Sequence, residues 1–252
     1  MISLTQREGI ATVLLSRPPV NAMDTAFVAR FTEILDEIER LKPTVVVLRS
    51  DQKCFCAGAD LAMIGSFFGA SGGTAAMIDY VKSLHRIFDC LEALPAVTIA
   101  VIAGAAMGGG LEMALACDLR ITAPAAKVGL PEARVGMIPG AGGTQRLARL
   151  CGQGVASRLI LTGELIDGRE AERLGLAQWC IEADALDAAV AAIATRTAGL
   201  SRQALIASKA CILAGLDPEK DGYAMEIAVP ETLMETEEAR ARVAQFFAPR
   251  QK

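Results

Sequence analysis

Two glutamates stand beside glycine-rich stretches of this sequence. Glu112 follows the three glycines at 108–110, and Glu132 lies 20 residues further on. A carboxyl group can move protons as a general acid or base, or it can simply offset the dipole at a helix end. The residues around Glu112 are apolar and predict a buried helix, in which a carboxylate is costly unless it is paired or used. The sequence therefore favours a functional role for Glu112 and leaves Glu132 open between a site residue and a surface helix cap.

Three turns rich in small residues could form a site with these glutamates. They are residues 54–61, 104–118 and 130–144. Glycine allows a ligand to approach the backbone, and a helix that begins after glycines presents unpaired N–H groups. Neither turn near the glutamates continues with the Lys-Ser/Thr pair of a phosphate-binding loop, and no GxGxxG follows a first strand. The turns therefore predict free backbone N–H groups without a nucleotide-binding motif.

The composition narrows the class of protein. Hydrophobic residues make up 52% of the 252 residues and aromatic residues only 4%, so the apolar content is largely aliphatic. Such a chain suits close-packed helices and buried strands, with apolar surface left for subunit contacts. The net charge of −4 argues against a basic surface that binds nucleic acid. Seven scattered cysteines argue against a secreted disulfide framework, and with a single histidine no metal site is expected.

One stretch approaches the length of a membrane span, since residues 93–111 are 19 residues without a charge. Pro95 near its start and the glycines in its second half favour a buried strand, a turn and a helix start instead. Residues 1–20 lack the apolar segment of a secretory signal. The sequence predicts a cytoplasmic protein that does not cross a membrane.

Periodicity and turn residues predict alternating strands and helices. A hairpin is expected around Gly9, and a mobile glycine-rich loop at 65–73. The expected strands are 2–8, 10–16, 44–48, 97–103, 118–123 and 127–130, and the main expected helices are 24–42, 75–93, 108–117, 184–199, 201–215 and 221–247. The alternation predicts an α/β fold with mainly parallel strands. Because the strand signal ends near residue 184, a small helical region is expected at the end of the chain.

Taken in order, the three turns resemble the enoyl-CoA hydratase/isomerase (crotonase) superfamily, and most of all its two-glutamate hydratases. The similarity extends over nearly the whole chain. The matching segments are CAGADL at 56–61, GGGLEMA at 108–114, Pro131-Glu132 with IPGAGGTQR at 138–146, LTG at 161–163 and AERLGL at 171–176. Each segment alone is modestly specific, whereas the ordered set is strongly so.

The resemblance implies a chemistry for these residues. The N–H groups of Ala59 and Gly109 would hold the thioester oxygen of an acyl-CoA as an oxyanion hole. Glu112 would orient and deprotonate a water that adds to a 2-enoyl thioester, and protonated Glu132 would deliver a proton to the α-carbon. The N–H group of Gly140 would help to place the water. No metal or redox cofactor is implied.

The resemblance also implies a substrate and an assembly. Coenzyme A would be part of the acyl-CoA thioester substrate, and its contacts would come from Ala57, Ala59, Asp60, Leu61, Ala62 and Gly109. The implied fold is a crotonase-like spiral of ββα units over residues 1–195, followed at 196–252 by helices that drive assembly into a homotrimer or hexamer. The stretch at 62–91 is slightly longer than in short-chain hydratases, which leaves the acyl chain length open.

Two alternatives remain at this point. One is another crotonase reaction, such as 3-enoyl-CoA isomerisation with Glu132 alone as acid–base. The other is an acyl-CoA-binding protein without catalysis.

A serine hydrolase would need the lone His85 in a pocket. The sequence instead places His85 on an amphipathic helix beside Leu84 and Arg86, where a non-catalytic role is expected.

Overall fold

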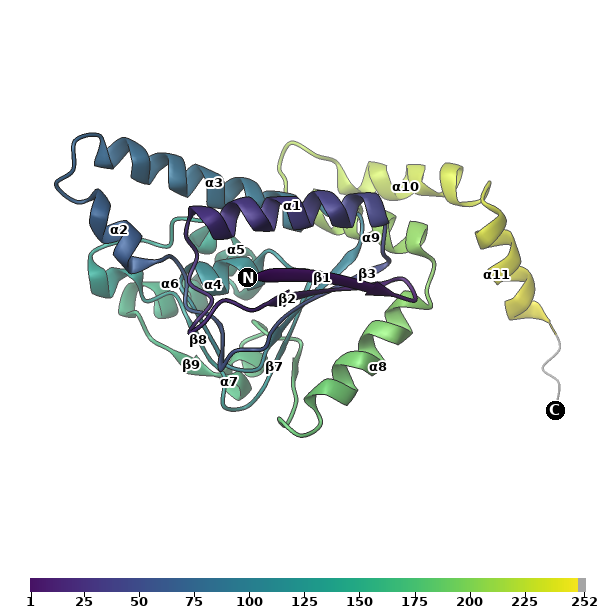
Figure 1. The fold of residues 1–252 in the computed structure, drawn as a ribbon. Coiled ribbons are helices and arrows are strands. Elements are labelled where there is room, and N and C mark those ends of the chain that lie inside the picture. Colours follow the sequence, from purple (N-terminus) through teal and green to yellow (C-terminus); the bar gives the residue numbers. More distant parts are fainter. Residues whose placement is uncertain (249–252) are drawn as a thin grey trace.

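A six-stranded sheet forms the centre of the computed structural model, which describes residues 1–248 (Figure 1). The strand order is β1-β2-β3-β5-β7-β10, in which β1 and β2 form an antiparallel hairpin and all other neighbours are parallel. The strands are β1 Ile2–Arg7, β2 Ile10–Leu15, β3 Val45–Ser50, β5 Val97–Ile102, β7 Leu119–Thr122 and β10 Trp179–Cys180. The expected hairpin and the mainly parallel α/β sheet are confirmed.

A second sheet of four short strands, in the order β4-β6-β8-β9, adjoins the three turns that are rich in small residues. Its strands are β4 Cys54–Cys56, β6 Ala105–Met107, β8 Lys127–Gly129 and β9 Ile166–Asp167. The chain adds a strand to the large sheet, then one to the small sheet, then a helical segment, and does so three times in succession. The sequence did not predict β4 and β6 as strands, because three residues are too few for a periodic pattern and their pairing depends on distant partners.

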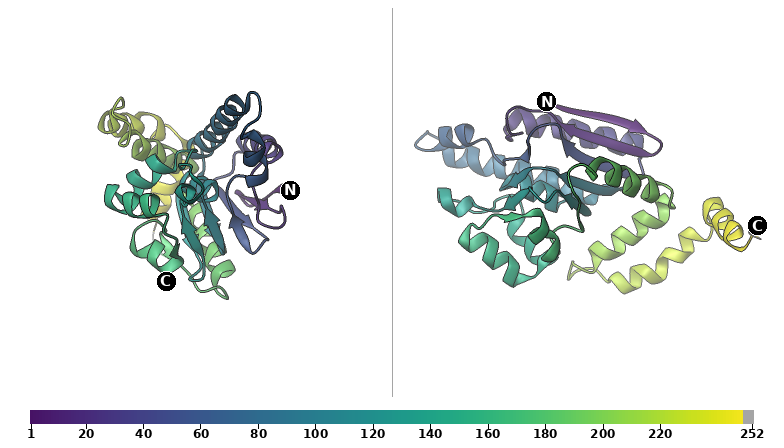
Figure 2. Two further views of the ribbon diagram at one scale, coloured as in Figure 1. Left: turned by 90° about the vertical axis from the view of Figure 1, so that its left-hand side faces the viewer. Right: turned by 90° about the horizontal axis from the view of Figure 1, so that it is seen from below.

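The buried β-branched run of β3 explains how the layers form. Val46 and Leu48 lie in one apolar cluster with the helices α1 (Thr25–Leu41) and α3 (Gly73–Ala93). Val45 and Val47 lie in a second cluster with α8 (Leu186–Ala198) on the opposite face. Successive side chains of a strand point to opposite faces, so a fully apolar strand is covered on both sides. Figures 1 and 2 show these helices on the two faces of the sheet.

The helices mostly follow the expected ranges. They are α1 Thr25–Leu41, α2 Leu61–Phe67, α3 Gly73–Ala93, α4 Gly109–Leu115, the 3-10 helix η1 Glu132–Val135, α5 Gly143–Cys151, α6 Gln153–Thr162, α7 Gly168–Arg173, α8 Leu186–Ala198, α9 Arg202–Ala214, α10 Gly222–Leu233 and α11 Glu237–Phe247. As expected, Asp24 caps α1, because its side chain accepts a hydrogen bond from the Phe27 N–H group.

Two expectations about local structure were wrong. The glycine-rich stretch 65–73 is not one loop, because its first residues end α2, where the Asp60 side chain caps the helix by accepting from Met63 N–H, and Gly73 begins α3. The single helix expected at 221–247 is two helices, because the Thr236 side chain accepts from Ala239 N–H and starts a new helix there.

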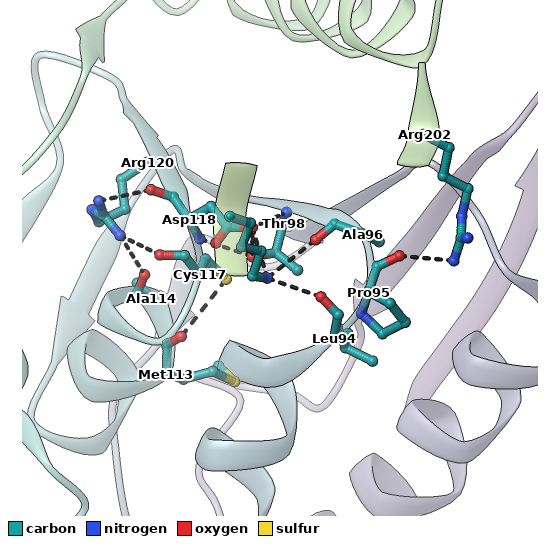
Figure 3. A network of polar contacts seen from close by, with 11 residues as sticks. Leu94, Pro95, Ala96, Thr98, Met113, Ala114, Cys117, Asp118, Arg120 and Arg202 are labelled. Atoms are coloured by element: carbon teal, nitrogen blue, oxygen red, sulfur yellow. Dashed lines mark hydrogen bonds and ion pairs between the residues drawn. The ribbon is translucent and has the colours of Figure 1, made fainter. Parts of the chain in front are cut away.

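Two basic side chains of α9, Lys209 and Arg202, hold the C-terminal helices to the core, and Figure 3 shows Arg202 bonded to Pro95. Lys209 Nζ donates to the carbonyl oxygens of Leu94 and Ala96 at 3.0 and 3.1 Å, and pairs with Asp118 Oδ2 at 2.9 Å. Arg202 donates to the carbonyl oxygens of Pro43 and Pro95. Beyond this anchor, α10 and α11 extend away from the rest of the molecule and carry no buried residue. In residues 1–248, no helix is both long and apolar enough to cross a membrane.

Candidate active site

The three glycines before Glu112 each meet a different neighbour, which explains why side chains are missing there. A β-carbon on Gly108 would lie 2.9 Å from Oε1 of Glu132, and one on Gly109 would lie 2.4 Å from Cε of Met23. A β-carbon on Gly110 would lie 2.1 Å from the carbonyl oxygen of Cys56. The N-terminus of α4 is therefore held in close backbone contact with β4, and Glu112 follows in its first turn.

Glu112 is held by the turn before α5. Its side chain is buried, and Oε1 accepts hydrogen bonds from the N–H groups of Ala141 at 2.8 Å and Gly143 at 2.7 Å. Burial raises the pKa of Glu112, while these two bonds and the charges of His85 and Arg146 oppose the rise. Since both donors bind Oε1, the orientation of the carboxyl group is set by residues about 30 positions later in the chain.

Glu132 lies near the start of α4 and has a different environment from that of Glu112. It begins η1, directly after Pro131, and Oε1 lies close to Gly108 at the start of α4. Oε2 is buried and has no hydrogen-bond partner among residues 1–248. Burial, with a smaller contribution from the charge of Glu112, raises the pKa of Glu132 to about 7. A buried, unpaired carboxyl oxygen is not what a solvent-exposed helix cap presents, so the structure favours a site residue.

Two backbone N–H groups lie together between β4 and α4. Gly58 has φ +97°, and a β-carbon there would lie 2.8 Å from the Met107 carbonyl oxygen and 3.1 Å from the nitrogen of Gly109. A β-carbon on Gly109 would in turn lie 3.7 Å from the nitrogen of Ala59. Within the described part of the chain, neither the Ala59 nor the Gly109 N–H group donates a hydrogen bond to the protein. The structure thus brings two free donors to one place.

Other sequence-predicted residues surround these donors. Ala57, Leu61 and Ala62 are exposed beside Ala59, at the end of β4 and the start of α2. The Asp60 carboxyl group already has a structural role, since it caps α2.

Gly140 lies in the turn that contacts Glu112, and a β-carbon there would lie 3.7 Å from a methyl group of Val81 on α3. His85 is exposed on the same helix, as expected. Among the described residues, no group of three or more histidine, cysteine or acidic side chains could hold a metal ion.

Two residues that support the Ala59 segment were missed by sequence reasoning. Asn21 is fully buried, and its Nδ2 donates to the Phe55 carbonyl oxygen at 2.9 Å. The Tyr80 hydroxyl donates to the Met23 carbonyl oxygen at 2.8 Å, and the same oxygen accepts from Asp60 N–H. These contacts join residues far apart in the chain, so a local pattern carries no signal for them.

Comparisons with known proteins identify the family of the chain. The family model "Enoyl-CoA hydratase/isomerase" matches residues 5–252. The chain is similar to "Probable enoyl-CoA hydratase 2, mitochondrial" of Arabidopsis thaliana, at 46% identity over 178 residues, which cover 69% of this chain and 58% of the relative. It is also similar to the human "Enoyl-CoA hydratase domain-containing protein 2, mitochondrial", at 44% identity over 67% of this chain and 57% of the relative. The chain therefore spans little more than half the length of these two curated relatives.

A solved structure covers the chain more fully. A crystal structure of an enoyl-CoA hydratase from Bacillus anthracis superposes with a TM-score of 0.90 at 33% identity, over 97% of this chain and 95% of that one. A Geobacillus kaustophilus relative gives a TM-score of 0.92 at 32% identity, over 99% and 94%. Both similarities span the two sheets and the C-terminal helices, so the expected fold is confirmed. The chain belongs to the enoyl-CoA hydratase/isomerase, or crotonase, family and has its α/β fold.

Proposed function

We propose that this chain is an enoyl-CoA hydratase, which reversibly adds water to a 2-enoyl-CoA thioester in syn fashion and gives a 3-hydroxyacyl-CoA. The observation that carries the proposal is the contrast between its two glutamates. Glu112 accepts two backbone N–H groups, whereas Glu132 is desolvated, with one oxygen unpaired and its pKa raised to about 7. Two carboxyl groups with such different surroundings can hold one proton between them, which acid–base catalysis of hydration requires.

In the proposed reaction, ionised Glu112 takes a proton from water while the water oxygen bonds to the β-carbon. The π electrons of the double bond move towards the thioester carbonyl and form an enolate. Protonated Glu132 then gives its proton to the α-carbon, and the enolate returns to a thioester. The water supplies the hydroxyl group, and proton exchange with solvent restores the glutamates.

The enolate oxygen would be held by the N–H groups of Ala59 and Gly109. Both donors are free within residues 1–248 and are fixed by close backbone contacts, so they need little reorganisation when negative charge develops. A preorganised donor of this type contributes about 2.7–4 kcal/mol to transition-state stabilisation. The Gly140 N–H group would orient the water from the turn that also holds Glu112.

The coenzyme A part of the substrate would lie along the exposed residues that precede and begin α2. Ala57, Leu61 and Ala62 are accessible there, and the backbone of Ala59 and Gly109 would complete the contacts around the thioester. The Asp60 carboxyl group would contribute by holding the start of α2, because it caps that helix.

The test is turnover of a panel of 2-enoyl-CoA esters by the wild-type chain and by Glu112→Gln and Glu132→Gln. Each substitution keeps the size of the side chain and removes its proton chemistry, so hydration should fall at least about 100-fold. Glu33→Gln, on the exposed side of α1, serves as a matched control and should keep full activity. Hydration that survives Glu112→Gln would contradict the two-glutamate mechanism.

The same variants separate the alternatives. Isomerisation of 3-enoyl-CoA with Glu132 alone predicts that Glu112→Gln keeps its activity and that Glu132→Gln loses it. This alternative has support from one relative, described as an enoyl-CoA isomerase/hydratase of Mycosarcoma maydis, which is 37% identical over 81% of this chain and 73% of its own length. A non-catalytic acyl-CoA-binding protein would bind the thioesters tightly and turn over none.

We further propose that residues 196–252 form an oligomerisation region distinct from the core at 1–195. Through the helices of this region the chain would form a homotrimer or hexamer. Support comes from the large apolar side chains exposed there, which are Tyr223, Ile227, Met234, Val243, Phe246 and Phe247. Apolar surface of this extent favours burial against another subunit. Sedimentation should show the oligomer. Residues 249–252 of the proposed region 196–252 lie outside the described structure.

The cellular compartment stays a prediction. The sequence suggests a cytoplasmic protein, whereas several relatives are described as mitochondrial. Fractionation of cells that express the full-length protein decides between these compartments.

A further inference from the structure

Arg146 is a buried cation without a part in the proposed proton transfers. It lies in α5, four residues after Gly142, and is 7% exposed. Burial of its guanidinium group lowers the pKa of Arg146, but hydrogen bonds and charges from Glu92 and Asp89 outweigh that effect and raise it. The side chain is therefore charged at physiological pH, and a charge at this depth must be satisfied by specific partners.

The partners of Arg146 come from two different parts of the chain. Nη2 binds Asp89 Oδ1 at 2.6 Å and Glu92 Oε2 at 2.9 Å, both on α3, and Nε also reaches Glu92 at 3.3 Å. Nη1 donates to the carbonyl oxygen of Ala141 at 3.1 Å. The guanidinium group thus joins α3 to the turn before its own helix through three nitrogens in a fixed planar arrangement, which the single nitrogen of a lysine does not reproduce.

The turn that Arg146 holds is the one that holds Glu112. Ala141 accepts from Arg146 through its carbonyl oxygen and donates to Glu112 Oε1 through its N–H group. Gly142 makes room for the guanidinium group, because a β-carbon there would lie 2.3 Å from Nη1. Gly143 then supplies the second N–H group to Glu112. A continuous chain of contacts runs from α3, through Arg146 and one turn, to a carboxyl group at the site.

We propose that Arg146 is a positioning residue, which fixes the 141–143 turn against α3 and thereby keeps the two N–H groups aimed at Glu112. Its effect on turnover rests on the proposed function, in which Glu112 directs the attacking water. Catalysis depends on such alignment, because a misplacement of about 1 Å can lower a rate about 100-fold. Among the described residues, Arg146 makes no hydrogen bond to Glu112 or Glu132 and acts through the turn.

The test uses Arg146→Ala, Arg146→Lys and Glu92→Gln in the full chain. Glu92→Gln leaves the arginine in place and weakens its anchor, so it remains informative if Arg146→Ala does not fold. The matched control is Arg158→Ala, which removes an arginine that pairs with two carboxylates, Glu164 and Glu170, at the surface. Two measurements are made on each variant: hydrogen exchange of the peptide covering residues 137–145, and kcat and KM for 2-enoyl-CoA hydration.

We expect faster exchange at 137–145 in Arg146→Ala and Glu92→Gln, and no change in Arg158→Ala. For Arg146→Ala, kcat should fall by up to about 100-fold with KM little altered. Arg146→Lys should not restore kcat, since lysine keeps the charge but lacks the planar set of guanidinium donors. In a Glu112→Gln background, Arg146→Ala should lower kcat no further, because the two residues act as one unit.

Unchanged exchange in Arg146→Ala and Glu92→Gln would overturn the proposal, whichever reaction the protein catalyses. Full activity of Arg146→Lys, or an undiminished effect of Arg146→Ala in the Glu112→Gln background, would overturn it as well, since either result means that Arg146 acts by charge or independently of Glu112. If the wild-type chain hydrates no enoyl-CoA, the proposed function fails, and the exchange measurement still decides whether Arg146 holds the turn.

Discussion

The N–H group of Gly143 donates a hydrogen bond of 2.7 Å to Oε1 of Glu112, and a β-carbon at position 143 would lie 2.8 Å from that same oxygen. The contact therefore needs both the backbone donor and the absence of a side chain. It also connects α4 and α5, because Glu112 lies in α4 and Gly143 begins α5. Disturbing it displaces the carboxyl group directly.

Gly143→Ala should lower hydration strongly and destabilise the protein by about 1–3 kcal/mol, because the added methyl group is forced against Glu112 in a filled interior. Activity assays and urea unfolding measure the two effects. Gly154→Ala is the matched control, since a β-carbon there meets nothing within 4 Å and an alanine favours the helix. Equal activity in the two variants would show that the Gly143 contact is not needed.

The pH profile of kcat/KM for hydration should have a basic limb at about 7, where Glu132 loses its proton. Dehydration should show the same limb, since each direction uses a glutamate pair that carries one proton. On the acid side, activity should fall as Glu112 becomes protonated. Initial rates in both directions across a buffer series measure this profile, and constant activity from neutral to distinctly alkaline pH would exclude Glu132 as the acid.

Glu132 should also make stability depend on pH. Its pKa is raised from 4.5 to about 7 in the folded state, so the folded protein binds the proton more tightly than the unfolded chain. The stabilisation is complete below the unfolded pKa and is lost as pH rises through about 7. Above that pH, Glu132→Gln should be more stable than wild type by about 1–3 kcal/mol, allowing for partial solvent screening. Urea unfolding at about pH 5 and about pH 8.5, on either side of the folded-state pKa, measures the difference. An equal gain at both would contradict this origin.

Lys209→Ala should destabilise the attachment of α9. The variant leaves Asp118 and two carbonyl oxygens without their cation at a site where the lysine side chain is 10% exposed, and we expect a loss of about 2–4 kcal/mol. Lys220→Ala removes a lysine that is 61% exposed and pairs with Asp217, and should change stability by less than about 1 kcal/mol. Similar losses in the two variants would mean that the α9 contacts are not specific.

Strong local patterns in the sequence predicted the regular elements. The apolar spacing after Asp24 predicted α1, and the β-branched run at 44–48 predicted β3, since a helix with one apolar stripe and a fully apolar strand each have few other ways to bury their side chains. Three consecutive glycines before Glu112 likewise predicted a helix start with unpaired N–H groups, whereas its close backbone contact with β4 became visible only in the structure.

Tertiary structure alone decided what the glutamates contact. Nothing local to Glu112 indicates that Ala141 and Gly143 donate to it, or that Arg146 holds these donors through Asp89 and Glu92 on α3. Contacts between distant residues also form the short strands β4 and β6, and they bury Glu132 and so raise its pKa. Residue types and spacing by themselves determined which groups could do chemistry. Their orientation and protonation depend on desolvation and hydrogen bonds from residues distant in the chain, and these exist only once the layers are assembled.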